Sequence, residues 1–205
     1  RGLLGQALEL TAQIGDLTYA AYICSNMMTH ALAIGDPLGR VQHDADSGSV
    51  FAWGPRFALV EDRLAAQRQL VRTLRGLTPV FGCFDARDFS EAAFEARLGG
   101  DVGLRLAACW YWIRKLQARY LAGEAAEALE ASERARTLLW TSPAYFEQAE
   151  YHFFAALARA ACCNPAVADD LATHLPVLAG HHRQLAQWAR RCRSEEHTSE
   201  LQSRL

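Results

Sequence analysis

The feature that most restricts the fold is a pair of helical patterns separated by one glycine, in residues 109–135. In the first half, CWYWIRKLQARYLA, aromatic and aliphatic side chains recur three and four residues apart. Gly123 ends this pattern, and an Ala- and Glu-rich segment follows. Two helices joined by so short a turn pack as antiparallel neighbours. The stretch therefore predicts a helix-pair repeat, and it identifies no reaction.

The same apolar spacing recurs along the chain, with Gly-Asp or Pro between the segments. Asp16 and Asp36 suit helix N-caps, because their carboxylates accept from the free N–H groups of the next turn, and Pro37 suits a first helical position. Asp88 with Glu91 fits a capping box. We expect no strands, and helices at residues 3–14, 17–34, 37–52, 55–75, 89–98, 103–122, 124–139, 143–162 and 166–190.

These segments predict an all-α fold, a tetratricopeptide-like solenoid of antiparallel helix pairs in a right-handed stack. The signature of that repeat is only partly present, at Trp112, Gly123, Ala128, Leu129 and Ala135.

Two of the expected helices indicate which side chains share a face. Trp112, Leu116 and Tyr120 follow at four-residue steps, so we expect them to pack against the Ala128 helix, with Trp112 buried. In residues 143–162 one apolar stripe is expected, with Glu147, Glu150 and Arg159 on the opposite side; the stripe consists of Phe146, Ala149, Phe153, Ala156, Leu157 and Ala160.

Composition excludes several classes of function. Hydrophobic residues make up 51% of the 205, enough to bury a sizeable core. A net charge of -2 gives no basic face for nucleic acid, and no apolar run is long enough to span a membrane. The six cysteines lack a CxxC spacing, which argues against a zinc ribbon or disulfide scaffold and favours a reducing cytoplasm.

Both ends of the chain look artificial. Arg1 is no start methionine, and a helical pattern begins directly after it, so we expect the true N-terminus to be missing. Residues 193–203, RSEEHTSELQS, resemble a translated sequencing adapter. We therefore expect a helical region over residues 1–192 and a non-native, unstructured tail over residues 193–205 with few tertiary contacts, Leu201 included.

No residue set predicts a catalytic, cofactor-binding or metal site. The glycines around Gly99 and Gly100 lack the lysine of a phosphate loop and predict an interhelical turn. His174 and His181 share a helix face without the thiolate or paired-histidine spacing of a zinc site. An alternative from another class is an all-α metal or thiol enzyme, built from His152, His174, His181 and Cys162.

Several tracts resemble a known family across residues 2–192; they are GDLTYA from Gly15, GDPL from Gly35, LRGLTP from Leu74, residues 107–123, LLWTSP from Leu138 and HHRQL from His181. The family is the helical, tetratricopeptide-like middle region of large bacterial hybrid signalling kinases. These combine a serine/threonine kinase-like domain, an AAA-type ATPase module, this region, a GAF sensor and a histidine kinase. Family members continue after the equivalent of Cys192 with Pro-Glu-Asn-Phe, whereas this chain continues with Arg193.

The resemblance implies a fragment of a cytoplasmic two-component signalling protein. ATP and Mg²⁺ would bind in other domains of that protein, since none of the family's catalytic motifs lies in this stretch. We expect a non-catalytic scaffold that relays between the ATPase module and the downstream GAF and histidine kinase domains. Its partners would be those neighbouring domains and a protein on a concave face, with no nucleic acid and no membrane. A free-standing tetratricopeptide adaptor is the alternative.

Overall fold

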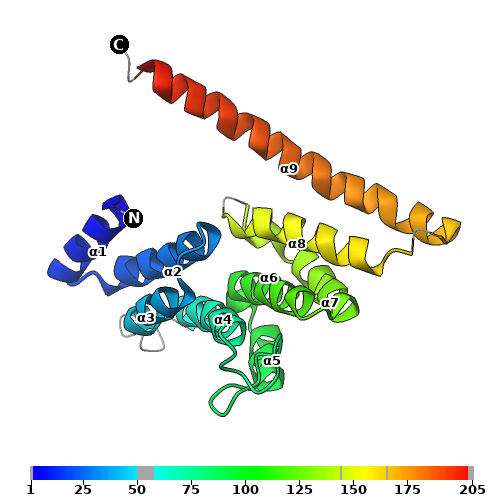
Figure 1. Cartoon of the computed structure of the whole chain (residues 1–205). Coiled ribbons are helices and arrows are strands. Elements are labelled where there is room, and N and C mark those ends of the chain that lie inside the picture. The colour runs from blue at the N-terminus through cyan, green and yellow to red at the C-terminus, as the bar shows by residue number, and fades with distance from the viewer. Residues whose placement is uncertain (1, 50–57, 144, 165, 203–205) are drawn as a thin grey trace.

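The computed structural model describes residues 2–49, 58–143, 145–164 and 166–202, and in these ranges the chain is built of helices (Figure 1). An isolated bridge between Ala86 and Phe89 is the one β-type pairing among the described residues. The expectation of an all-α chain is confirmed. The helices are α1 (Gly2–Gln13), α2 (Leu17–Ala33), α3 (Leu38–Ser49), α4 (Ala58–Leu74), α5 (Glu91–Gly100), α6 (Arg105–Leu121), α7 (Ala125–Arg136), α8 (Glu147–Cys162) and α9 (Ala168–Gln202), with 3-10 turns at Val102–Leu104 and Leu139–Thr141.

Local capping explains several helix boundaries. The Asp16 side chain accepts from Tyr19 N at 3.1 Å, as expected for the N-cap of α2. The capping box predicted at Asp88 is wrong, because α5 begins at Glu91 and Ser90 is its N-cap. The Asp88 carboxylate instead accepts two hydrogen bonds from Arg72, at 2.9 and 3.0 Å. An ion pair with the preceding helix has replaced the local cap.

Each helix packs against helices that lie close to it in the sequence. The helices α2, α4, α6 and α8 contact one another in that order, and α3 and α7 each contact the two members of this row that flank them in the chain. The short α5 lies against α6, α1 against α2, and α9 against α8, as Figure 1 shows. The row of α2, α4, α6 and α8 therefore forms an inner layer that links all the others.

The helix α6 contributes to most of the core. Among the described residues, buried apolar side chains form three clusters: one between α2, α3 and α4, one around α4, α5 and α6, and one between α6, α7 and α8. Leu116 is fully buried in the last of these, beside Ala128, Ala131 and Ala135 of α7. The small alanines let the two helices approach closely, so the predicted packing of α6 on α7 is confirmed.

The predicted burial of Trp112 is wrong. Trp110 and Tyr111 are fully buried, whereas Trp112 is only partly buried and lies at the edge of two clusters. The guanidinium of Arg134 stands over the Trp112 ring, 4.8 Å from its centre. Because α6 is covered by α4 on one side and by α7 and α8 on the other, its buried surface is wider than a single stripe.

On α8 the buried face is not the apolar stripe of the sequence. The buried positions are Glu147, Tyr151, Ala155 and Ala158, four and three residues apart, while Phe153 is half exposed. Ala155 and Ala158 let α8 approach α7 closely, and Glu147 is held inside by hydrogen bonds from Thr29 and Arg114. Of the apolar stripe, Phe146, Phe153 and Ala160 are exposed, while Ala149, Ala156 and Leu157 are partly buried.

The last helix differs from the expected unstructured tail. The backbone of α9 remains helical to Gln202. Figure 1 shows its C-terminal part continuing past the N-terminal end of α8. Residues 193–202 contain no glycine or proline, so a helix begun upstream can propagate through them. The side chain of Leu201 and residues 203–205 lie outside what is described.

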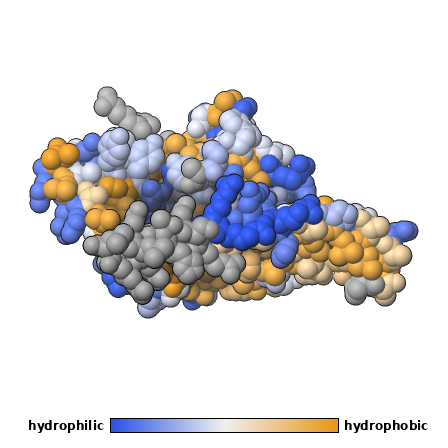
Figure 2. All heavy atoms as spheres, turned by 90° about the horizontal axis from the view of Figure 1, so that it is seen from above, coloured by the Kyte–Doolittle hydropathy of each residue, from blue (hydrophilic) through white to orange (hydrophobic). Residues whose placement is uncertain are grey.

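Both ends of the packed row expose apolar side chains. No residue of α1 is buried, and Leu3, Leu10 and Ile14 are 83%, 60% and 75% exposed. At the other end Leu175 and Val177 of α9 are exposed, and Figure 2 shows hydrophobic residues gathered at the right-hand end, where α9 begins. None of the described helices is both long and apolar enough to cross a membrane.

Candidate functional site

An apolar groove crosses the inner layer. It encloses about 400 Å³ and takes its lining from five helical segments: Leu32 and Ala33 of α2, Leu70 and Leu74 of α4, Gln117 and Leu121 of α6, Phe146, Ala149, Glu150, Phe153 and Phe154 at α8, and Leu185 of α9. All of these are apolar except Gln117 and Glu150. The groove therefore contains Phe146, Ala149 and Phe153 of the apolar stripe at α8.

A buried ion-pair network lies beneath the groove. Arg114 of α6 is fully buried, and its guanidinium donates to Glu147 Oε1 at 3.1 Å and to Glu150 Oε1 at 2.7 Å. Glu147 Oε1 also accepts from Thr29 Oγ1 at 2.5 Å, and Thr29 Oγ1 accepts from Gln67 Nε2 at 2.6 Å. These contacts join α2, α4, α6 and α8, so the network ties together every helix of the inner layer.

Burial and ion pairing shift the pKa values of the network residues in opposite directions. Burial raises the pKa of Glu147, although Arg114 and the Thr29 hydroxyl favour its charged form. For Arg114, burial alone lowers the pKa, but the carboxylates of Glu150 and Glu147 outweigh it and raise the pKa. The guanidinium therefore stays charged, and its positive charge is what makes two carboxylates tolerable in the interior.

A second buried arginine lies among aromatic rings. The Arg63 guanidinium stands 3.6 Å from the centre of the Trp110 ring, and the rings of Tyr145 and Tyr22 lie at 5.3 and 6.0 Å. Burial lowers the pKa of Arg63, opposed first by the charge of Glu147. Trp110 is itself fixed, since its Nε1 donates to Ser142 Oγ at 3.1 Å. Arg63 thus lies between α4 and α6 against the Trp110 ring, and its Nε and Nη1 have no hydrogen bond among the described residues.

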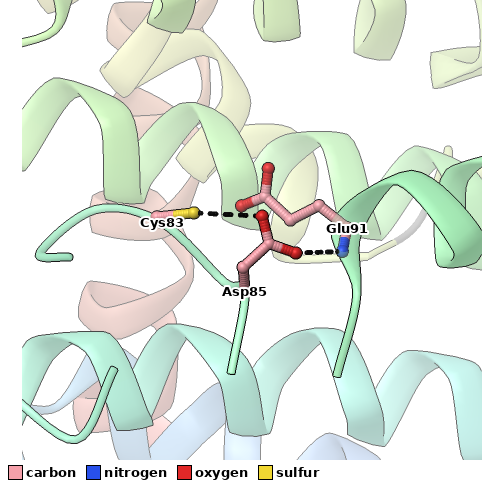
Figure 3. Close-up of side chains that lie close together, drawn as sticks. All are labelled: Cys83, Asp85 and Glu91. Carbon is pink, nitrogen blue, oxygen red and sulfur yellow. Dashed lines mark hydrogen bonds between the residues drawn. The ribbon is translucent and has the colours of Figure 1, made fainter. Parts of the chain in front are cut away.

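Cys83 and Asp85, in the loop before α5, and Glu91, the first residue of α5, form a compact group (Figure 3), with potential ligand atoms within 4.8 Å of one another. Asp85 accepts from Glu91 N at 2.7 Å, and Glu91 Oε1 accepts from Phe84 N at 2.6 Å. Glu91 Oε2 pairs with Arg119 at 2.9 Å and Lys115 at 2.8 Å. The Glu91 carboxylate is already bound by two cations and a backbone amide. The group therefore suits a structural role, in which it holds the loop against α6, better than a metal site.

The four residues of the alternative enzyme site are not brought together. His152 and His181 meet, with their Nδ1 atoms 2.9 Å apart, and Trp188 stacks edge-on against His152. Among the described residues the one group of three possible ligands is the Cys83 group, so His174 and Cys162 do not join the histidine pair. Burial also raises the pKa of the Cys162 thiol, whereas a reactive cysteine needs a lowered pKa.

The histidine pair predicts that acid loosens α9 from α8. The pKa of His152 is lowered from 6.5 to about 4, first by burial and then by the charge of His181. The pKa of His181 is lowered by burial and by the charge of Arg159, while the charge of Glu133 opposes the shift. The unfolded chain then binds more protons between pH 6.5 and 4, so stability present above pH 6.5 is lost as the pH falls through this range, by about 1–3 kcal/mol. Urea unfolding at pH 7.5, 6 and 5 measures the loss.

Two variants act as controls for that prediction. Replacing both histidines, in His152→Leu with His181→Leu, should flatten the pH dependence, whereas exposed His182→Gln should leave it unchanged. Equal slopes in all three proteins would show that the pair does not carry the effect.

The sequence patterns missed the groove and the network for one reason. Glu147 and Glu150 follow the spacing of a solvated helix face, and only the approach of α6 places Arg114 opposite them. Gly99 and Gly100, predicted to form an interhelical turn, are instead the last two residues of α5, and the 3-10 turn follows at Val102. No protein-family model matches the chain, and comparisons with curated proteins and with solved structures also give no match.

Proposed function

We propose that this chain is a non-catalytic segment of an α-helical repeat solenoid, tetratricopeptide-like in its packing, that acts as a protein-binding scaffold. The observation that carries the proposal is the packing order, in which α2, α4, α6 and α8 contact in succession and α3 and α7 bridge consecutive members. Contacts that fall mainly between sequence neighbours are typical of stacked helix pairs, and the hydrogen bond from Thr29 of α2 to Glu147 of α8 is an exception to this order. The exposed apolar residues of α1 and α9 suit faces that receive further repeats, since terminal repeats need a polar outer face.

The place of the segment in a larger protein rests on the resemblance of its sequence tracts. We propose that it belongs to a cytoplasmic bacterial hybrid kinase and relays between an AAA-type ATPase module and the GAF and histidine kinase domains. Reading the source DNA outward from both ends of this segment tests that placement. Uninterrupted reading frames for those domains would support it, and their absence would favour the free-standing adaptor.

The relay role predicts a conformational effect inside the parent kinase. Ala135 is fully buried between α6 and α7, so Ala135→Leu should force these helices apart at a cost of about 1–3 kcal/mol and alter phosphoryl-transfer output. Ala126→Leu makes the same chemical change at an exposed position of α7 and is the matched control. Equal kinase output in the two variants would contradict a relay through this packing.

The isolated segment is expected neither to hydrolyse ATP nor to phosphorylate itself. Phosphoryl transfer needs phosphate-cradling amides, a cation and metal-binding carboxylates, and the sequence has neither a Gly-rich phosphate loop nor the Asp and Asn motifs. Incubation with γ-labelled ATP and Mg²⁺, beside a sensor kinase as positive control, measures both activities. Time-dependent label on any histidine, tested with His152→Gln, would overturn the scaffold proposal.

A further inference from the structure

The groove has the form of an open trough. Phe146 and Phe153 on its α8 wall are 48% and 49% exposed, while Leu70 on its α4 wall is buried. A small ligand in a typical pocket has about 70–90% of its surface buried, which a trough of this kind does not provide. Apolar side chains projecting from a protein segment suit it better, because the segment itself covers the open side.

One polar atom in the groove wall has no partner. The Glu150 side chain is nine-tenths buried; its Oε1 accepts from Arg114 at 2.7 Å and from Gln117 Nε2 at 3.0 Å, while its Oε2 has no hydrogen bond. Gln117, the other polar lining residue, uses its Nε2 on Glu150 and its Oε1 on Arg114. A buried carboxylate oxygen without a donor is costly, so a ligand that brings a donor gains from it.

The charge around Glu150 specifies the donor. Arg114 is shared between two carboxylates, Glu147 and Glu150. The positive charge of Arg63 acts on Glu147 and on the rings of Trp110 and Tyr145. The free Oε2 is a carboxylate oxygen, so a charged donor such as lysine or arginine forms the stronger hydrogen bond with it, whereas a second carboxylate in the same place has no proton to donate.

We propose that the groove binds an amphipathic helix of a protein partner, which inserts large apolar side chains between α4 and α8 and directs one lysine or arginine to Glu150 Oε2. The proposal rests on the protein-binding role proposed above and names the partner's chemistry. Helices bind grooves through apolar residues at positions i, i+3 or i+4, and i+7, and a basic residue beside that stripe reaches the groove wall. Because Glu150 Oε2 is buried, this binding mode requires side chains that line the groove to move aside for the basic side chain.

The test uses synthetic helical peptides as probes. The first is an Ala-based peptide of about 16 residues with leucines at i, i+3 and i+7 and one lysine beside them. A second carries norleucine in place of the lysine, and a third carries glutamate. Fluorescence anisotropy with the whole chain is expected to show the lysine peptide binding about tenfold more tightly than the norleucine peptide, and the glutamate peptide more weakly than both. Equal affinity for the lysine and glutamate peptides would overturn the proposal.

Variants of the chain locate the bound peptide. Glu150→Gln keeps an acceptor for Arg114 and should remove the preference for lysine while leaving the norleucine peptide unaffected. Phe153→Ala should weaken both peptides, whereas Leu175→Ala, which truncates a similarly exposed side chain on α9, should weaken neither. If Leu175→Ala and Phe153→Ala weaken binding equally, the peptide binds the exposed end of the row and the groove proposal is wrong.

Failure of this inference is distinguishable from failure of the proposed function. A helical chain without ATPase activity that binds none of the peptides contradicts the groove proposal alone. Labelling of the chain by ATP contradicts the scaffold proposal, whatever the peptides show.

Discussion

Replacing Arg114 with alanine is expected to lower the free energy of unfolding by about 3–5 kcal/mol, as for a buried ion pair that loses one member. The guanidinium is fully buried and bridges Glu147 and Glu150. Without it, two carboxylates remain close together in the interior, with only Thr29 and Gln117 as side-chain donors. The chain must then protonate them or admit water. Urea unfolding followed by circular dichroism at pH 7.5 measures the loss.

The matched control is an arginine in an exposed ion pair. Arg136 pairs with Glu133 at 2.7 Å, but its side chain is 62% exposed, and such pairs contribute less than about 1 kcal/mol. Arg136→Ala should therefore change stability little. A loss in Arg114→Ala no larger than in Arg136→Ala would show that water reaches the network.

Replacing all three charged residues of the network separates the contribution of their charges to stability from the contribution of their packing. Replacing Arg114 with methionine together with Glu147→Leu and Glu150→Gln removes the three charges of the network, and substitutions of this kind are often neutral or stabilising, although the buried Arg63 then loses the nearby charge of Glu147. We expect this triple variant to recover most of the stability lost in Arg114→Ala. The network would then be costly to break but unnecessary for stability, as expected if its retention serves the groove above it.

The helices could be predicted from the sequence because their signals are local. Gly15 with Asp16 and Gly35 with Asp36 mark helix ends by backbone chemistry that depends on a few neighbouring residues, and the structure keeps those ends within a residue or so. The tail shows the limit of this reasoning: its unusual sequence suggested disorder, but residues 193–202 contain no glycine or proline that would end the helix begun upstream.

The groove could not be predicted, because it depends on which helices meet. Phe146 and Phe153 have the spacing of a core stripe, and hydrophobic spacing alone does not distinguish a buried face from an open groove. The same holds for Glu147, whose charge suggested solvent. Its burial follows from the position of Arg114 and Thr29 on two other helices, with Thr29 118 residues away in the chain.

The two neighbouring tryptophans of α6 provide the other large expected effect. Trp110→Ala should cost about 3–5 kcal/mol, because the ring is fully buried and its removal leaves a cavity. The substitution also removes the aromatic ring whose centre lies 3.6 Å from the buried Arg63 guanidinium. A desolvated cation–π contact of this kind contributes about 2 kcal/mol. Trp112→Ala should cost clearly less, since that ring is only partly buried and contacts the exposed Arg134.

Comparison of Trp110→Ala and Trp112→Ala by thermal and urea unfolding decides which face of α6 is the core. The double variant Trp110→Ala with Arg63→Met measures how much of the loss comes from the stranded guanidinium. Because methionine removes the charge that the Trp110 ring stabilised, the double variant is expected to be less destabilised than the sum of the two single changes. A larger loss in Trp112→Ala than in Trp110→Ala would contradict this packing of α6 and restore the burial that the sequence alone predicted.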